Sequence, residues 1–198
     1  MVWQVIHKGI FRIMMFGRYI RTKVQLWPSL LAGLRVGRGS TVDSPIFTWP
    51  HQVQIGDDCV IERDVFFKYD GVWSEGPSII LGNNTFVGTG SEFNISDKIT
   101  VGQDCLIASG CKFVDHDHGY DFRHLPIRLQ PPQEAPIIIE ENVWLGFNVV
   151  VLKGVTIGKG AIVAAGSVVN QSIPEQEIWG GVPARKIKSR KYEKSTSA

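Results

Sequence analysis

The sequence predicts an all-β protein whose chain winds as a solenoid of hexapeptide repeats, and two patterns and the composition support this. From Ile139 to Val169 an aliphatic residue returns at every sixth position, and a smaller residue stands two places before each later one. Helices repeat about every 3.6 residues and ordinary strands every two, so a period of six indicates a three-faced coil with one hexapeptide per face. The 198 residues are 43% hydrophobic and 20% charged, which is typical of a soluble globular protein. The aliphatic positions are Ile139, Leu145, Val151, Ile157, Val163 and Val169, and the smaller residues are Val143, Val149, Val155, Ala161 and Ser167.

Residues 1–34 differ from the repeats and form the first expected element. The first 42 residues hold seven Lys or Arg and no Asp or Glu, and bulky apolar residues mix with the charges from His7 to Trp27. This pattern indicates a basic amphipathic helix, which either caps the first coil with its apolar side or contacts an anionic membrane surface peripherally. Its apolar run is too short to span a bilayer, and no small-residue cleavage site of a signal peptide follows it.

The hexapeptide pattern continues upstream and places a β-helix domain over residues 35–182. Val36 with Ser40 begins the series, and three runs of three repeats each span one coil. Breaks in phase between runs mark loops, and the longest loop covers residues 114–136. Residues 183–198 are expected to form a basic tail with a short helix. The runs are Ile55, Ile61 and Phe67; Leu81, Val87 and Phe93; and Val101, Ile107 and Phe113.

The three cysteines, Cys59, Cys105 and Cys111, all occupy the smaller inward position of a repeat. We therefore expect them to be buried small hydrophobic residues. An odd number of thiols without a secretion signal favours a reducing compartment, and so a cytoplasmic protein. The net charge is +2, the basic residues gather at the two ends, and no nucleic-acid-binding motif occurs, which argues against a nucleic acid partner.

Candidate chemistry lies in the long loop, because a solenoid by itself does none. Residues 114–124 contain three of the five histidines together with three aspartates and an arginine. Such a segment either solvates the surface or supplies a general base. An imidazole has a reference pKa near 6.5, and a carboxylate that holds one ring nitrogen prepares the other to accept a proton.

Residues 79–188 resemble the left-handed β-helix acyltransferases of the hexapeptide-repeat superfamily, especially the maltose, galactoside and nodulation-type O-acetyltransferases and those of polysaccharide biosynthesis. The motifs that carry the resemblance are Asn142-Val143-Trp144-Leu145-Gly146, Gly154-Val155-Thr156-Ile157-Gly158, Ala165-Gly166-Ser167-Val168-Val169 and Gly180-Gly181-Val182-Pro183-Ala184-Arg185. The resemblance implies a left-handed parallel β-helix and a homotrimer with active sites between subunits. It also implies direct transfer of an acetyl group from acetyl-CoA to a hydroxyl of a sugar or glycan precursor, with no metal.

The same resemblance implies a loop histidine as the base. The family pattern His-x-x-Asp matches His118 with Asp121, and gapless counting from Ile107 also reaches His118, so His118 is the first choice and His116 the second. The other histidine then orients the base or binds the acceptor, and Asp115, Asp117 or Asp121 fixes the imidazole tautomer. By position in the motifs, the residues expected to contact CoA are Trp144, Gly146, Ala165, Gly166, Asn170 and Arg185.

The acceptor is expected to bind at residues 68–75, a loop that interrupts the repeat and carries Tyr69, Asp70 and Trp73. Aromatic side chains stack on sugar rings, and carboxylates accept hydrogen bonds from sugar hydroxyls. Some relatives use an Asn on the coil that includes Val87; Gly88 falls at that position here, and Asn94 lies nearby.

Three other functions remain open from the sequence. The first is N-acetylation of an amino sugar. The second is a zinc hydratase that uses His116, His118 and His124, although these residues share one loop instead of lying on stacked coils. The third is a non-catalytic trimeric scaffold or sugar-binding module in which the histidine loop is only a contact surface.

Overall fold

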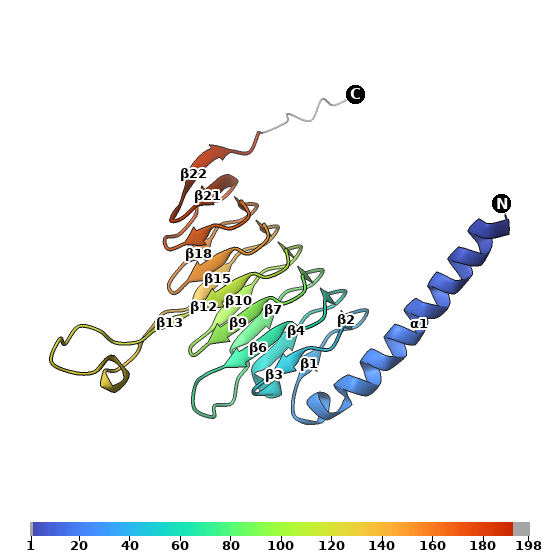
Figure 1. Ribbon diagram of the computed structural model, residues 1–198, viewed down its shortest axis with the longest axis horizontal. Helices are drawn as coiled ribbons and strands as arrows, with labels where there is room; N and C mark the ends of the chain where they lie inside the picture. The colour runs from blue at the N-terminus through green and yellow to red at the C-terminus, as the bar shows by residue number, and fades with distance from the viewer. Residues whose placement is uncertain (1, 192–198) are drawn as a thin grey trace.

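The computed structural model describes residues 2–191, which form one long helix and a three-faced parallel β-helix (Figure 1). The helix α1 (Val2–Leu31) comes first, and the chain then winds through stacked coils. Each complete coil contributes one short strand to each of three sheets, here called faces A, B and C. A loop leaves the coils at residues 115–136, and a hairpin ends the described chain.

The strands of each face stack in chain order. Face A holds β1 (Arg35–Val36), β4 (Val53–Ile55), β7 (Ile79–Leu81), β10 (Ile99–Val101), β15 (Ile137–Ile139) and β18 (Thr156–Ile157). Face B holds β2 (Thr41–Val42), β5 (Val60–Ile61), β8 (Phe86–Val87), β11 (Leu106–Ile107), β16 (Trp144–Leu145), β19 (Ile162–Val163), β21 (Glu177–Gly181) and β22 (Ala184–Ser189). Face C holds β3 (Ile46–Phe47), β6 (Phe66–Tyr69), β9 (Glu92–Ile95), β12 (Lys112–Val114), β17 (Val150–Leu152) and β20 (Val168–Val169). Outside the faces lie η1 (Pro50–Gln52), β13 (His116–Asp117), η2 (Ile127–Leu129) and β14 (Gln133–Glu134).

The period of six corresponds to the register of these ladders. On face A, parallel pairing aligns Val36 with Ile55, Ile55 with Leu81, and so on through the fifth and sixth coils. Each predicted aliphatic position is buried, apart from Val36 in the first coil, which is half-buried because no coil precedes it. The predicted repeat positions are therefore confirmed from Ile55 to Val169.

Aromatic rings fill the core beneath the middle of face C. Phe67, Phe93 and Phe113 are fully buried and stack with ring centroids 5.1 and 4.6 Å apart, and Phe47 continues the stack at 5.4 Å from Phe67. Rings at these separations interact favourably beyond the area that they bury. This stack lies next to the point where the long loop leaves β12, so it supports the base of that loop.

The cysteines are buried as predicted, in the smaller inward positions. Burial raises the pKa of the Cys105 and Cys111 thiols to about 11. Thiols with this pKa stay protonated at neutral pH and react slowly.

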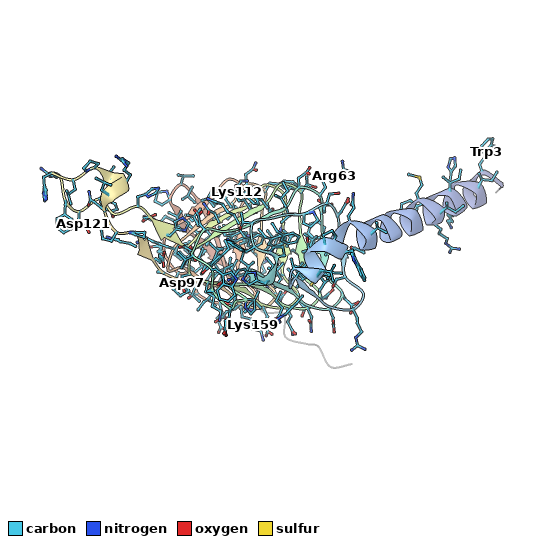
Figure 2. All side chains as sticks on the ribbon, turned by 90° about the horizontal axis from the view of Figure 1, so that it is seen from below. Trp3, Arg63, Asp97, Lys112, Asp121 and Lys159 are labelled. Atoms are coloured by element: carbon cyan, nitrogen blue, oxygen red, sulfur yellow. The ribbon has the colours of Figure 1, made fainter. Side chains whose placement is uncertain are left out.

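The expected helix at the N-terminal end is present, but it caps the coils only with its last turns. Leu26 and Leu34 are buried in the core, and Ser44 donates a hydrogen bond of 3.4 Å to the side chain of Gln25. The rest of α1 projects away from the coils in both views (Figures 1 and 2). Among residues 2–191, no helix is both long enough and apolar enough to cross a membrane.

The expectation of a helical C-terminal tail is wrong for the described part of that segment. Residues 184–189 form β22, which pairs antiparallel with β21 at the end of face B. The unpaired edge of β21 explains this, because an open edge strand exposes a row of backbone hydrogen-bonding groups that a returning strand can pair. Residues 192–198 of the expected tail lie outside the described residues.

Replacing Phe93 by Ala is expected to lower the free energy of unfolding by about 3–5 kcal/mol, because it opens a cavity between two stacked rings. Denaturant unfolding followed by circular dichroism measures this change. Val72→Ala is the control, since Val72 is 86% exposed and its replacement should change stability by less than about 0.5 kcal/mol. Equal midpoints for the two variants would contradict the role assigned to the stack.

Candidate active site

The histidine loop is a long excursion whose two arms pair as a short ribbon. β13 and β14 are antiparallel, with His116 opposite Glu134 and Asp117 opposite Gln133. Beyond them the loop folds around Gln130, whose buried side chain donates to the carbonyl groups of Phe122 and Leu125. The loop projects from the opposite side of the coils to α1, with Asp121 far from the coils (Figure 2).

Asp115 is a fully buried carboxylate at the base of this loop. Its oxygens accept hydrogen bonds from the backbone N–H groups of Ser96, Asp97 and Lys98, at 2.8, 2.8 and 2.9 Å. These donors belong to the turn between β9 and β10, one coil earlier. The carboxylate therefore ties the loop to the neighbouring coil.

His116 is the fourth partner of this carboxylate. Its Nδ1 lies 2.9 Å from Oδ1 of Asp115, and its side chain is 17% exposed. Because a carboxylate only accepts, Nδ1 carries the proton and Nε2 keeps a free lone pair. Nε2 lies 3.8 Å from Oδ2 of Asp70, on the outer surface of face C. This is the arrangement of a general base whose tautomer is fixed by a buried acid.

The structure does not bring His118 and Asp121 together. His118 is exposed, and no hydrogen bond or ion pair joins its imidazole to another described residue. Asp121 accepts a hydrogen bond of 3.1 Å from the side chain of Gln133, and Asp117 forms an ion pair of 3.5 Å with Lys153. Of the loop residues considered from sequence, the geometry thus pairs Asp115 with His116.

Residues 68–75 reach the same surface from an earlier coil. Lys68 donates to Asp70 at 2.8 Å, which places a cation and a carboxylate beside His116. Tyr69, in contrast, is buried: its hydroxyl lies 3.3 Å from that of Ser74, so it supports the loop instead of lining the surface. Trp73 is 65% exposed.

Three further residues, Trp49, His51 and Gln52, pack beside Trp73, Ser74 or one another and were missed from sequence. The His51 ring lies between Trp49 and Trp73, with ring centroids 5.8 and 6.0 Å away, and its Nε2 lies 2.9 Å from the carbonyl oxygen of Ser74. Buried Gln52 also donates to that carbonyl and to the Ser74 hydroxyl. This aromatic row forms because the loop that contains Trp73 and Ser74 packs against residues 51 and 52 of an earlier coil. The spacing of these residues in the sequence gave no signal for it.

Asn94 lies on the outer surface of face C, where the ladder pairs it with Lys68 on one side and Val114 on the other. Its Oδ1 is buried and has no hydrogen-bond partner among the described residues. A buried carbonyl oxygen of this kind is uncommon in native proteins and suggests a ligand that donates to it.

Most residues expected to hold CoA lie elsewhere on this chain, whereas Asn170 follows β20 and aligns with Val114, two strands of face C further on. Gly146, Ala165 and Gly166 form the corners that lead from face B into face C, and a Cβ on Gly146 would lie only 2.6 Å from the backbone nitrogen of Ala165. Asn170 and Arg185 are exposed at the end of the coils. Along the chain, these corners precede the strands of face C and His116 follows one of them, so the corners and His116 lie at opposite edges of this face. Gly110 lies in the turn before β12, and from there to His116 the chain advances six residues, a path of at most about 20 Å.

A hollow of about 500 Å³ lies on face B next to these corners. Trp144 is 51% exposed there, and Leu106 stacks beside it in the adjacent strand. The remaining lining residues are Glu62, Phe86, Ala108, Ser109 and Phe147. Exposed apolar side chains in a row along one face indicate an interaction surface. A signal was available in the sequence, because Phe86 and Leu106 occupy outward positions of their hexapeptides.

Within residues 2–191, no three His, Cys, Asp or Glu side chains come together in a way that could hold a metal ion.

Comparisons with known proteins point to one family. A model of bacterial transferase hexapeptides matches residues 136–171, and a model of the hexapeptide repeat of succinyl-transferase matches residues 78–111. The chain is similar to a solved hexapeptide-repeat acetyltransferase of Vibrio cholerae, VCA0836, in complex with acetyl coenzyme A. The two are 30% identical, with a TM-score of 0.61, over 86% of this chain and 79% of that one. These matches confirm the predicted left-handed β-helix.

Two curated relatives agree. WbbJ of Escherichia coli K12, named for O-acetyl transfer in lipopolysaccharide biosynthesis, is 41% identical over 105 residues, which cover 49% of this chain and 53% of WbbJ. Rv3034c of Mycobacterium tuberculosis, named as a probable acetyltransferase, is 32% identical over 168 residues, which cover 85% of this chain and 48% of Rv3034c. The chain thus spans about half the length of these curated relatives.

Replacing Asp115 by Asn is expected to release His116 from a single tautomer, because an amide has only one oxygen for the four donors that surround it. Nitrogen NMR of the histidine ring should show a proton on Nδ1 in the parent protein and a mixture in the variant. Asp117→Asn, on the exposed neighbour, is the matched control and should leave the ring unchanged. A parent imidazole protonated on Nε2 would contradict the assignment.

Proposed function

Since the chain belongs to the hexapeptide-repeat transferase family, we propose that it transfers an acetyl group from acetyl-CoA to a hydroxyl of a sugar or glycan precursor. The observation that carries this proposal is the pair of Asp115 and His116, with Nε2 of the imidazole free on the outer surface of face C. A base held in this way can take a proton from an alcohol at neutral pH.

The proposed reaction proceeds in one transfer. His116 Nε2 takes the proton of the acceptor hydroxyl while the hydroxyl oxygen attacks the thioester carbonyl of acetyl-CoA. The carbon–sulfur bond then breaks, CoA leaves as a thiolate, and the imidazolium returns its proton to that thiolate. Asp115 and Asp70, both close to the ring, stabilise the positive imidazolium that forms in between.

Asn94 and Asp70 are suited to hold the acceptor. The unpartnered Oδ1 of Asn94 accepts a hydrogen bond from a sugar hydroxyl, and the carboxylate of Asp70 is exposed enough to accept another. Lys68 fixes Asp70 through their hydrogen bond of 2.8 Å. The acceptor is thereby placed beside His116 Nε2.

The aromatic row of Trp49, His51 and Trp73 extends this acceptor site along face C. Trp49 is 40% and Trp73 65% exposed, and Gln52 holds the loop that carries Trp73. Exposed aromatic rings offer stacking surfaces for the apolar faces of sugars. A row that begins at the first coil suits an acceptor longer than one sugar, which supports a glycan precursor as the substrate class.

The acyl donor is proposed to bind along the hollow with Trp144 and the corner residues, where small side chains admit a narrow pantetheine arm. Arg185 supplies a cation for the phosphates at the end of the coils. Because the corner residues and His116 lie at opposite ends of the strands of face C, the proposed reaction uses the donor site of a neighbouring subunit. We therefore propose a homotrimer with active sites between subunits.

The first test is acetyl transfer by His116→Ala and His118→Ala, followed as CoA thiol release with Ellman's reagent. The three cysteines of the protein are buried, so their background should be small. His116→Ala should lower kcat about 100- to 10,000-fold with unchanged acetyl-CoA affinity, because it removes a general base. His118→Ala should change kcat less than about tenfold. The reverse ranking would make His118 the base.

The acceptors in this assay are a neutral glycoside and its amino-sugar counterpart, each with the same ring and linkage. Faster release with the glycoside is expected for O-acetylation. Release only with the amino sugar would contradict the proposed acceptor class, and acetyl-CoA binding without release from either would require a different acceptor.

Replacing Trp73 by Ala is expected to raise KM for a disaccharide acceptor about five- to thirty-fold, since one stacking contact contributes about 1–2 kcal/mol. A monosaccharide acceptor, which reaches only His116 and Asn94, should be affected less. Steady-state kinetics with both acceptors measures the difference, with Val72→Ala as the neighbouring control. An equal effect on both acceptors would argue against an extended aromatic subsite.

A further inference from the structure

The projecting part of α1 carries an apolar face that no other described residue covers. Its described members fall into two groups, at residues 3–13 and 24–31, with steps of three or four residues inside each group. At 100° per residue all of them lie within about 60° of Ile6, along one side of the helix. Their exposed fractions run from 43% for Ile6 to 75% for Leu31. Figure 2 shows this helix extending well beyond the coils, with Trp3 near its far end. The described members are Trp3, Ile6, Ile10, Ile13, Val24, Trp27 and Leu31.

The opposite side of the same helix is basic. Lys8 and Arg12 lie roughly 120–160° around the helix from Ile6 at 100° per residue, and both are exposed. The first 42 residues contain seven Lys or Arg and no acidic residue. A stripe of aromatic and aliphatic side chains, with Lys8 and Arg12 on the other side of the helix and Phe11 beside them, is the pattern of a helix that lies in a membrane interface.

We propose that α1 binds an anionic lipid surface, with its apolar face among the upper acyl chains and its cations at the lipid headgroups. The helix is 30 residues long, so about 45 Å of it can lie along the surface. Trp3 and Trp27, near its two ends, suit the boundary between acyl chains and headgroups. Lipid phosphates supply the negative charge that this segment lacks.

A second copy of the chain fits this face less well. Paired copies of α1 would bring together two positively charged helices, and the segment has no acidic residue to offset their repulsion. An anionic membrane removes that repulsion and covers the apolar face at the same time. The loop with His116 leaves the opposite side of the coils (Figure 2), so a surface bound along α1 leaves the loop uncovered.

The test is flotation of the full chain with vesicles of phosphatidylcholine alone or mixed with phosphatidylglycerol. Binding should be at least tenfold stronger to the anionic vesicles. Lys8→Gln with Arg12→Gln should weaken that binding about 25-fold, because each basic side chain near an anionic surface contributes about a factor of five. Ile10→Ser with Ile13→Ser should also weaken it at least tenfold, with folding intact because both residues are exposed.

The matched control is Arg63→Gln with Lys188→Gln, which removes the same charge from exposed positions on the coils and should leave binding unchanged. Sedimentation of the same variants determines the oligomeric state. No vesicle binding by the parent chain would overturn the proposal, as would equal weakening by the control pair. A changed oligomeric state of the Ile10 and Ile13 variant, with vesicle binding retained, would assign the face to a second copy. None of these outcomes depends on acetyl transfer.

Discussion

Parallel hydrogen bonding between successive coils is the constraint on which the rest of this structure depends, because it decides which residue of each hexapeptide points inward. The ladder of face C aligns Phe67, Phe93 and Phe113, and it pairs Val114 with Asn94. Side chains alternate along a strand, so the residue after Val114 points inward and the next one outward. The fold therefore buries Asp115 and presents His116, with no special turn between them.

Burying a carboxylate in this position is costly unless its oxygens are fully paired. The inward neighbours of Asp115 in earlier coils are Ile95 and Tyr69, so the carboxylate meets mainly apolar side chains on that side. Three backbone N–H groups of the turn at residues 96–98 and the imidazole of His116 supply the missing donors. The same pairing that makes the charge tolerable fixes the histidine tautomer, so the stability of this loop and the geometry of the proposed base have one cause.

The repeat could be predicted from the sequence because a period of six is a local property that each coil shows again. The contacts with other coils could not, since Asp70 beside His116 and the N–H donors of residues 96–98 to Asp115 are distant in sequence. Counting from a family motif favoured His118, whereas alternation from Phe113 would have favoured His116. A short helix was expected in the C-terminal tail, but Ala184 is buried and its successors are exposed on a strand that covers the edge of β21. The amphipathic pattern predicted α1, though not that most of it would project from the coils.

The positions of the proposed donor site and of the proposed acceptor site around His116 also constrain how the proposed reaction can occur. His116 follows a strand of face C, whereas Gly146 and Ala165 precede such strands, so they lie at opposite edges of this face. Each further coil lengthens both edges but does not reduce the distance between them. No side chain spans the length of a strand together with its flanking corner. The exposed apolar row that includes Leu106 and Trp144 lies beside the corners proposed to bind the acyl donor. A second subunit that covers this row can bring its own histidine loop to these corners. In the proposed trimer, the surface that holds the subunits together thus also completes each active site, so that catalysis and assembly depend on the same face.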